Sequence, residues 1–291
     1  MNASDEEGHT PLCRAASAGH REVVAILVDA GADVSATTRN GWTALTWAAS
    51  RGHADAVQAL LRAGASKGND PLVAAAGAGH PDVVSLLIDT SVPGGSIALA
   101  AAAREGHADV VGLLLASRSD ALAPSASGET LVCEAAAARY TEVVAELLDA
   151  GASPLEPCTD GQPLITLAAG PAGVRLVDLL VARGADLGAL NRAGNTPLIV
   201  ASARGRREVV EALLRHGADP DVRGDHRWTA LMAAAAAGRL EVVRALVATG
   251  ARTGSRDEEG HTAEAIARAR GHSEIAELLE KSGGGGILSR F

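Results

Sequence analysis

Apolar and polar positions alternate along this chain as they do in short amphipathic helices arranged in pairs. Apolar residues recur every three or four positions within 12–16 and again within 23–28, the spacing that places them on one face of a helix. Thr10 can cap the first helix, and Pro11 suits its first position, where no backbone N–H is needed. Gly19 can end that helix in a left-handed conformation that is favourable only for glycine. The pattern therefore predicts a helix, a turn, a second helix and a polar loop.

This pattern recurs through the whole chain. A glycine marks the predicted turn between paired helices, with successive spacings of 33, 27, 27, 99, 33 and 33 residues, at Gly19, Gly52, Gly79, Gly106, Gly205, Gly238 and Gly271. The spacing of 99 spans three periods in which Arg139 and Ala172 replace the glycine. We count nine repeats in all. A fixed period of this length is typical of stacked repeat proteins, in which each repeat contacts only its neighbours.

The sequence resembles the ankyrin repeat family. The residues that carry the resemblance are openings such as Thr196-Pro197-Leu198, centres with two alanines before Gly-His, and endings with paired valines, paired leucines and Gly-Ala-Asp. They cover about residues 5–281. The resemblance implies an all-α repeat solenoid, a curved and elongated stack of helix–turn–helix units with finger loops projecting to one side.

The predicted organisation is an ankyrin repeat domain at 1–281, of about nine units, and a glycine-linked C-terminal tail at 282–291. The two 27-residue spacings shorten the connections, so we expect shortened fingers near 64–71 and 90–98. We expect an irregular unit near 168–174, where an extra residue and a proline interrupt the pattern.

Composition limits both the interior and the partners. Aromatic residues are 2% of the chain and hydrophobic residues 47%, so Ala, Val and Leu must fill the core. A net charge of −9 argues against nucleic-acid binding, and no apolar stretch approaches the ~20 residues that span a membrane. The first residues do not resemble a signal peptide.

Three cysteines are too few for a disulfide framework, so we interpret Cys13, Cys133 and Cys158 as small buried or incidental thiols and expect a cytoplasmic location.

No sequence pattern predicts catalysis, a cofactor or a metal site. The phosphate-binding, dinucleotide-binding and zinc-protease motifs are absent from the sequence. Several histidines hold the same position in separate repeats, at His20, His53, His80, His107 and His272. They should lie one layer apart, too far to share a zinc ion at ~2.0–2.1 Å bonds. We therefore expect no enzyme, and we interpret these histidines as residues that begin a helix and have a repeated structural role.

The remaining functional candidates lie on the surface. In ankyrin repeat proteins the finger tips and inner helices contact partners, so the resemblance implies a non-catalytic protein–protein interaction scaffold that binds a protein or peptide on its concave finger face. Carried over position by position, the partner-binding candidates are Trp42, Trp228, Arg39, Arg51, Arg192, Asn195, Arg204 and His226. Trp42 and Trp228 share one finger position and are the first candidates, because tryptophan is enriched in binding hot spots. Alternatively, each packs on an adjacent finger.

Arginines are concentrated within 192–244. Arg204, Arg206 and Arg207 cluster at one predicted corner, and Arg239 follows one repeat later. Such a group could hold an acidic segment of a partner through charge-assisted contacts. The alternative is a solvated arginine face.

A different class of function is a regulatory or targeting subunit of an enzyme complex. In that hypothesis the tail at 282–291, with its four glycines and its final Phe291, is a tethered docking peptide. The alternative for the tail is a disordered end or a cloning remnant.

Overall fold

The computed structural model describes residues 2–67, 70–88, 95–117, 130–158, 161–170 and 173–284. The chain divides into two compact parts, an N-terminal part at Met1–Ala152 and a C-terminal part at Ser153–Phe291. In the described ranges the secondary structure is helical, without strands, apart from one isolated bridge between Thr37 and Thr43. This confirms the all-α repeat fold that the sequence predicts.

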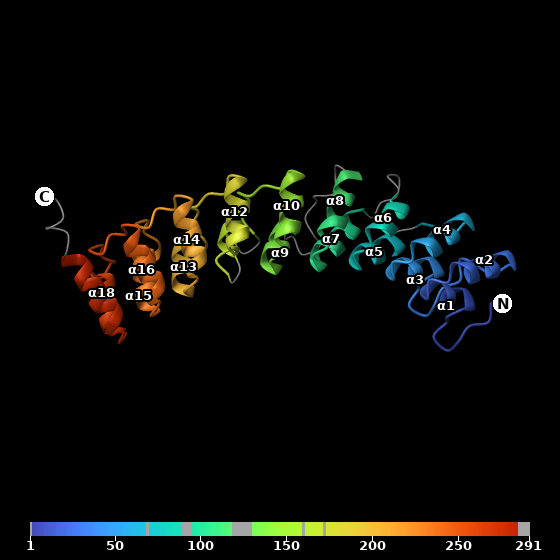
Figure 1. Cartoon of the computed structure of the whole chain (residues 1–291), viewed down its shortest axis with the longest axis horizontal. Helices are drawn as coiled ribbons and strands as arrows, with labels where there is room; N and C mark the ends of the chain where they lie inside the picture. The colour runs from blue at the N-terminus through green and yellow to red at the C-terminus, as the bar shows by residue number, and fades with distance from the viewer. Residues whose placement is uncertain are drawn as a thin grey trace. The chain divides into compact units, whose positions relative to one another are not determined.

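In the N-terminal part, each helix contacts its pair partner and the matching helix of the neighbouring pair, so the helices form two rows (Figure 1). The first helices of the pairs are α1 (Pro11–Ser17), α3 (Ala44–Ser50), α5 (Asp70–Gly77), α7 (Gly95–Glu105) and α9 (Leu131–Ala138). The second helices are α2 (Arg21–Asp29), α4 (Ala54–Arg62), α6 (Pro81–Leu87), α8 (Ala108–Ser117) and α10 (Thr141–Asp149).

The C-terminal part repeats this arrangement. Its first helices are α11 (Leu164–Leu167), α13 (Pro197–Arg204), α15 (Ala230–Ala236) and α17 (Ala263–Ala269). Its second helices are α12 (Val174–Ala182), α14 (Arg207–Arg215), α16 (Leu240–Ala248) and α18 (Ser273–Gly284), and a short 3-10 turn, η1 (Asp225–Arg227), precedes α15.

The predicted helix ends are confirmed in the first repeat. Thr10 accepts a hydrogen bond from the backbone N–H of Cys13 at 3.2 Å, and Pro11 is the first residue of α1. Thr43 and Thr196 cap α3 and α13 in the same way. Gly19 has a φ of 73° after α1, the left-handed conformation expected of it.

Small side chains let the helices pack closely. Ala48 and Ala49 of α3 and Ala75 and Ala76 of α5 are fully buried, with 0% of their surface exposed. Most of the largest fully buried side chains are leucines, such as Leu45. A core of Ala, Val and Leu, as the composition requires, therefore lies between the helices.

The glycines between paired helices make room for a side chain from the next repeat. A Cβ on Gly52, which has a φ of 73°, would lie only 2.6 Å from Nδ1 of His80. Nε2 of the same ring is 3.2 Å from the carbonyl oxygen of Ser50. Since a carbonyl oxygen only accepts, Nε2 of His80 is the donor of this hydrogen bond.

The same contact occurs along both parts of the chain. The pairs are Gly19 with His53, Gly79 with His107, Gly106 with Tyr140, Gly205 with Arg239, and Gly238 with His272. His53 and His107 also bond a carbonyl oxygen of the preceding repeat, at 3.1 and 3.2 Å. The repeated structural role predicted for these histidines is confirmed for His53, His80, His107 and His272.

The cysteines differ from expectation. Cys13 is free and buried, as predicted, but Cys133 and Cys158 are disulfide-bonded. Their interpretation as incidental thiols is therefore wrong. The spacing of the cysteines in the sequence gave no sign of disulfide bonding. The cysteines consequently no longer support a reducing compartment, and the cytoplasmic location stays a prediction.

Parts of the predicted irregular regions lie outside the described residues. These are 68–69 and 89–94 in the two shortened connections, 171–172 in the irregular unit, and 285–291 in the tail. Helix α18 ends at Gly284, so the first three residues of the predicted tail are helical. None of the helices within the described ranges is long and apolar enough to cross a membrane.

We predict that Gly52→Ala destabilises the protein more than Gly64→Ala. Both glycines are left-handed, with φ of 73° and 86°, which costs an alanine about 1–2 kcal/mol. The Cβ at Gly52 meets His80, whereas no atom of the described residues lies within 4 Å of a Cβ at Gly64. Overpacking should add about 1–3 kcal/mol at Gly52. Urea unfolding of the two variants measures the difference, and equal free energies of unfolding would contradict the packing argument.

Candidate functional site

The fingers at 5–9, 38–42, 191–195, 224–228 and 257–261 are tight loops that end just before a first helix. In the fingers at 5–9, 191–195 and 257–261, the N–H of the first residue donates to the carbonyl oxygen of the fifth at 3.0–3.1 Å. The side chain of the first residue closes the loop further. In the last finger, Asp257 accepts hydrogen bonds from the N–H groups of Glu259 and His261, at 3.0 and 2.7 Å.

Backbone hydrogen bonds join neighbouring fingers. The N–H of Arg39 donates to the carbonyl oxygen of Glu7 at 3.0 Å, and the N–H of Glu258 donates to that of His226 at 3.2 Å. Each bond fixes a finger beside the next one. Side chains from two successive repeats can therefore line one pocket.

One cavity of about 380 Å³ lies in the N-terminal part, and we call it the Trp47 pocket. It is lined by His9, Arg14, Ser17, Ala18, Trp47 and Arg51. Ser17 ends α1, Trp47 lies on α3, and Arg51 directly follows α3. A finger residue and the C-terminal ends of two first helices thus meet at one place.

The aromatic rings of this region form a cluster. Trp42 packs edge-on against Trp47 with ring centroids 4.8 Å apart. The ring centroid of His9 lies 5.3 Å from that of Trp47. Trp42 therefore packs on a helix of its own repeat, which neither sequence interpretation anticipated. Trp47 both packs against these rings and lines the cavity.

The Trp47 pocket is rich in hydrogen-bond donors. Arg14 forms an ion pair with Asp5, and the N–H of His9, followed by the Arg14 guanidinium, lowers the pKa of Asp5 to about 2. Arg51 is exposed. The indole N–H of Trp47 is buried and has no acceptor among the described residues.

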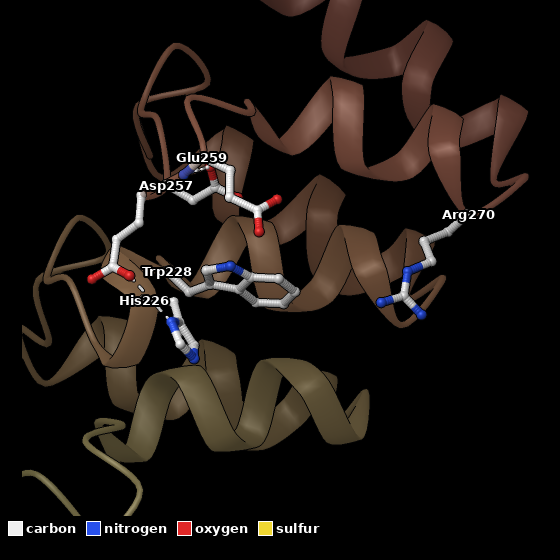
Figure 2. A pocket seen from close by; sticks show the side chains of 6 residues that line it. His226, Trp228, Asp257, Glu259 and Arg270 are labelled. Carbon is white, nitrogen blue, oxygen red and sulfur yellow. Dashed lines mark hydrogen bonds and ion pairs between the residues drawn. The ribbon is translucent and has the colours of Figure 1, made fainter.

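A second cavity, of about 300 Å³, lies in the C-terminal part and is shown in Figure 2; we call it the Trp228 pocket. It is lined by His226, Trp228, Asp257, Glu258, Glu259 and Arg270. In Figure 2 the half-buried indole of Trp228 extends across the pocket, with Glu259 beside it, His226 near its base and Arg270 beyond its far edge. Two successive fingers and the end of α17 build this pocket.

The finger that carries Trp228 departs from the others. Arg227 occupies the position that Gly41, Gly194 and Gly260 hold elsewhere, and its φ is 60°. His226 before it is also left-handed, with a φ of 50°. Side chains rarely adopt this conformation, which costs of order 1–3 kcal/mol for each residue. The strained tip lies directly beside the Trp228 pocket.

Charge in this pocket is mostly negative. Asp257 is buried and accepts hydrogen bonds within its own finger, whereas Glu258 and Glu259 are exposed. Nδ1 of His226 lies 3.2 Å from a carboxylate oxygen of Glu258. This hydrogen bond, with the charges of Asp225 and Glu258, raises the pKa of His226 above its ordinary value.

The other predicted partner residues lie outside these two cavities. Arg39 is exposed, 4.0 Å from a carboxylate oxygen of Glu7. Arg192 lines a separate opening of about 330 Å³ with Gln162, Asn191 and Ala193. Asn195 donates from its amide to the carbonyl oxygen of Ala193 within its own finger, at 3.2 Å. Arg204 is exposed.

The predicted arginine cluster is partly occupied by contacts within the chain. Arg207 forms ion pairs with Glu211 at 2.7 Å and Glu241 at 3.5 Å. Arg239 donates to the carbonyl oxygen of Ala203 at 3.2 Å. Arg204, also at this corner, is exposed and has no such contact with the part of the chain that the structure describes.

Sequence reasoning missed Arg14, Glu258, Glu259 and Arg270 as pocket residues. Their repeats were considered one at a time, whereas each pocket is built from two. One signal was present, since the string Asp-Glu-Glu-Gly-His-Thr occurs at both 5–10 and 257–262. Among the described residues, no group of three His, Cys, Asp or Glu side chains is placed to hold a metal ion.

Comparison with known proteins identifies relatives of this architecture. A family model described as ankyrin repeats (3 copies) matches residues 1–69, 63–125, 132–224 and 218–285. The crystal structure of the human ASB11 ankyrin repeat domain is similar, with 25% sequence identity and a TM-score of 0.61. The similarity covers 73% of this chain and 100% of that one. A search of curated proteins found no match.

We predict that Glu258→Gln lowers the pKa of His226. The carboxylate stabilises the imidazolium, so their attraction is present below the ordinary pKa of histidine and disappears as pH rises through the raised pKa of His226. NMR titration of the His226 ring gives the midpoint directly. Glu105→Gln, in the N-terminal part, is the matched control and should leave the midpoint unchanged. An unchanged midpoint in Glu258→Gln would show that the contact does not persist in solution.

Proposed function

The chain belongs to the ankyrin repeat family, and on that premise we propose that it is a non-catalytic scaffold that binds a protein or peptide through its fingers and the ends of its first helices. Ankyrin repeats are generally protein–protein interaction modules. The proposal extends this general role to a particular face of this chain.

One observation carries the proposal. Finger and helix-end residues of two successive repeats, His9, Ser17, Ala18 and Arg51, line one cavity, the Trp47 pocket, and Arg51 is one of the partner-binding candidates. A second predicted pair, His226 and Trp228, lines the Trp228 pocket. Pockets that combine a tryptophan with arginine or carboxylate groups resemble the anchor sites at which interfaces concentrate their binding energy.

The rigid spacing of the fingers also supports binding. Because backbone hydrogen bonds join Arg39 to Glu7 and Glu258 to His226, the surface is formed before a partner arrives. A preformed surface loses little conformational entropy on association, which favours affinity. A shallow surface with these properties suits a peptide segment better than a small-molecule substrate.

An acidic segment of the partner near residues 192–244 is a further part of the proposal. Fewer arginines support this part than the sequence suggested, because Arg207 forms an ion pair with Glu211 and Arg239 donates a hydrogen bond to the carbonyl oxygen of Ala203. Arg192 and Arg204, two exposed arginines among the predicted partner residues, are guanidinium groups that such a segment would meet. Their partners would be carboxylates, which arginine binds in a bidentate manner.

We predict that replacing both Trp42 and Trp228 with alanine weakens partner binding. Truncating a hot-spot tryptophan costs at least about 2 kcal/mol, or roughly 30-fold in affinity. The partner is first captured from the source cell on the wild-type chain and purified, and its dissociation constant is then measured for each variant by calorimetry.

The matched control is Ile26→Ala, which changes a residue that is 66% exposed on α2, away from the fingers. Its affinity should equal that of the wild type. Circular dichroism must show an intact fold in the double variant, because Trp42 packs on Trp47. A partner that binds the folded double variant as tightly as the wild type would overturn the assignment of these two tryptophans.

A further inference from the structure

The Trp228 pocket carries an excess of exposed negative charge. The side chains of Glu258 and Glu259 are 56% and 81% exposed. Their nearest cationic groups are imidazoles, with His226 3.2 Å from Glu258 and His261 3.3 Å from Glu259. The charge of a histidine generally changes between pH 5 and 8, so an imidazole balances a carboxylate less completely than a guanidinium does. The lining contains one permanent cation, Arg270.

The indole of Trp228 gives this charge a second recognition element. A tryptophan face attracts cations through its ring quadrupole, by about 0.5–1 kcal/mol at exposed sites and more when water is excluded. A guanidinium can also stack on the ring while its N–H groups bond a carboxylate. Glu259 and Trp228 line the same pocket (Figure 2), so one bound cation can meet both side chains.

The pocket depends on a finger that keeps the closing backbone bond, from the N–H of Gly224 to the carbonyl oxygen of Trp228 at 2.8 Å, but lacks the side chain that closes other fingers. Gly224 stands where Asp257 and Asn191 close their own fingers, and a Cβ there would lie 2.7 Å from Oδ1 of Asn195. The left-handed His226 and Arg227 follow it. This backbone holds Trp228 and His226 at the rim, and the carbonyl oxygen of His226 accepts the N–H of Glu258 at 3.2 Å.

We propose that the Trp228 pocket binds a basic side chain, an arginine or a lysine, of the protein or peptide partner. The stem of the side chain lies on the indole of Trp228, and its charged head lies between Glu258 and Glu259. Arg270, beyond the far edge of the ring, repels the head and so directs it toward the fingers. This inference rests on the proposed function, because it names the chemistry of the partner at one of its two pockets.

The experiment uses the full chain and three small probes. N-acetyl-arginine amide carries a positive charge, N-acetyl-glutamine amide is neutral, and N-acetyl-glutamate amide is negative. The readout is the NMR signal of the Trp228 indole N–H, assigned by its loss in Trp228→Phe. We expect the arginine probe alone to shift this signal in a saturable manner, with a dissociation constant on the order of 10 mM.

Charge variants then test the orientation. Glu258→Gln and Glu259→Gln should each weaken the arginine probe several-fold, and Arg270→Gln should strengthen it about two- to five-fold. Glu280→Gln, an exposed change on α18, alters the net charge equally and should have no effect. The proposal is overturned if the arginine probe does not shift the signal, if the glutamate probe shifts it as much, or if Arg270→Gln weakens binding of the arginine probe.

The binding of the arginine probe and the binding of a captured partner can be tested separately, so the failure of this inference is distinguishable from the failure of the proposed function. If the arginine probe binds while a captured partner ignores Trp228→Ala, the pocket chemistry stands and its use by that partner is refuted. If the partner requires Trp228 while the arginine probe does not bind, the proposed function stands and this inference fails.

Discussion

The contact between a left-handed glycine and a ring from the next repeat is the constraint on which the rest of the structure depends. A residue with a Cβ at Gly52 would collide with His80, and the ring of His80 bonds the backbone of the preceding repeat at Ser50. The close approach of the His80 ring to Gly52 and its hydrogen bond to Ser50 together fix the distance and the register of the two repeats. Because the register is fixed, successive fingers meet through backbone hydrogen bonds, such as that from Glu258 to His226. The pockets exist because fingers of adjacent repeats are held side by side.

Much of this architecture could be predicted from local patterns. Thr10, Pro11 and Gly19 determine where α1 begins and ends through interactions within a few residues. The local sequence was therefore sufficient to predict the ends of this helix. The shortened spacing of 27 residues changes the connection without changing the register. A Cβ added at Gly52 or Gly79 would lie as close to the ring of His80 or His107 as a Cβ added at Gly19 would lie to the ring of His53. The disulfide-bonded state of Cys133 and Cys158 had no comparable local signal, since it depends on tertiary structure.

The candidate site could be predicted only in part, because a pocket combines residues from two repeats. Trp42 and Trp228 hold equivalent positions, yet their surroundings differ. The helix position that faces Trp42 is occupied by Trp47, and the ring fills the space. The corresponding position in the repeat of Trp228 is Ala233, whose small side chain provides no such ring. The carboxylates of Glu258 and Glu259 then come from the following repeat. A comparison of equivalent positions between repeats would have revealed this difference, whereas a search for single motifs could not.

The most direct test of this account is a double-mutant cycle between Gly52 and His80, with free energies of unfolding measured for Gly52→Ala, His80→Ala and the double variant. If the ring of His80 is what a Cβ at Gly52 meets, removing the ring should relieve most of the packing cost. The account predicts a coupling energy of at least about 1 kcal/mol, with Gly52→Ala less harmful once His80 is alanine. Costs that add to within about 0.5 kcal/mol would show that the two residues do not act together, and would contradict the constraint from which the register and the pockets follow.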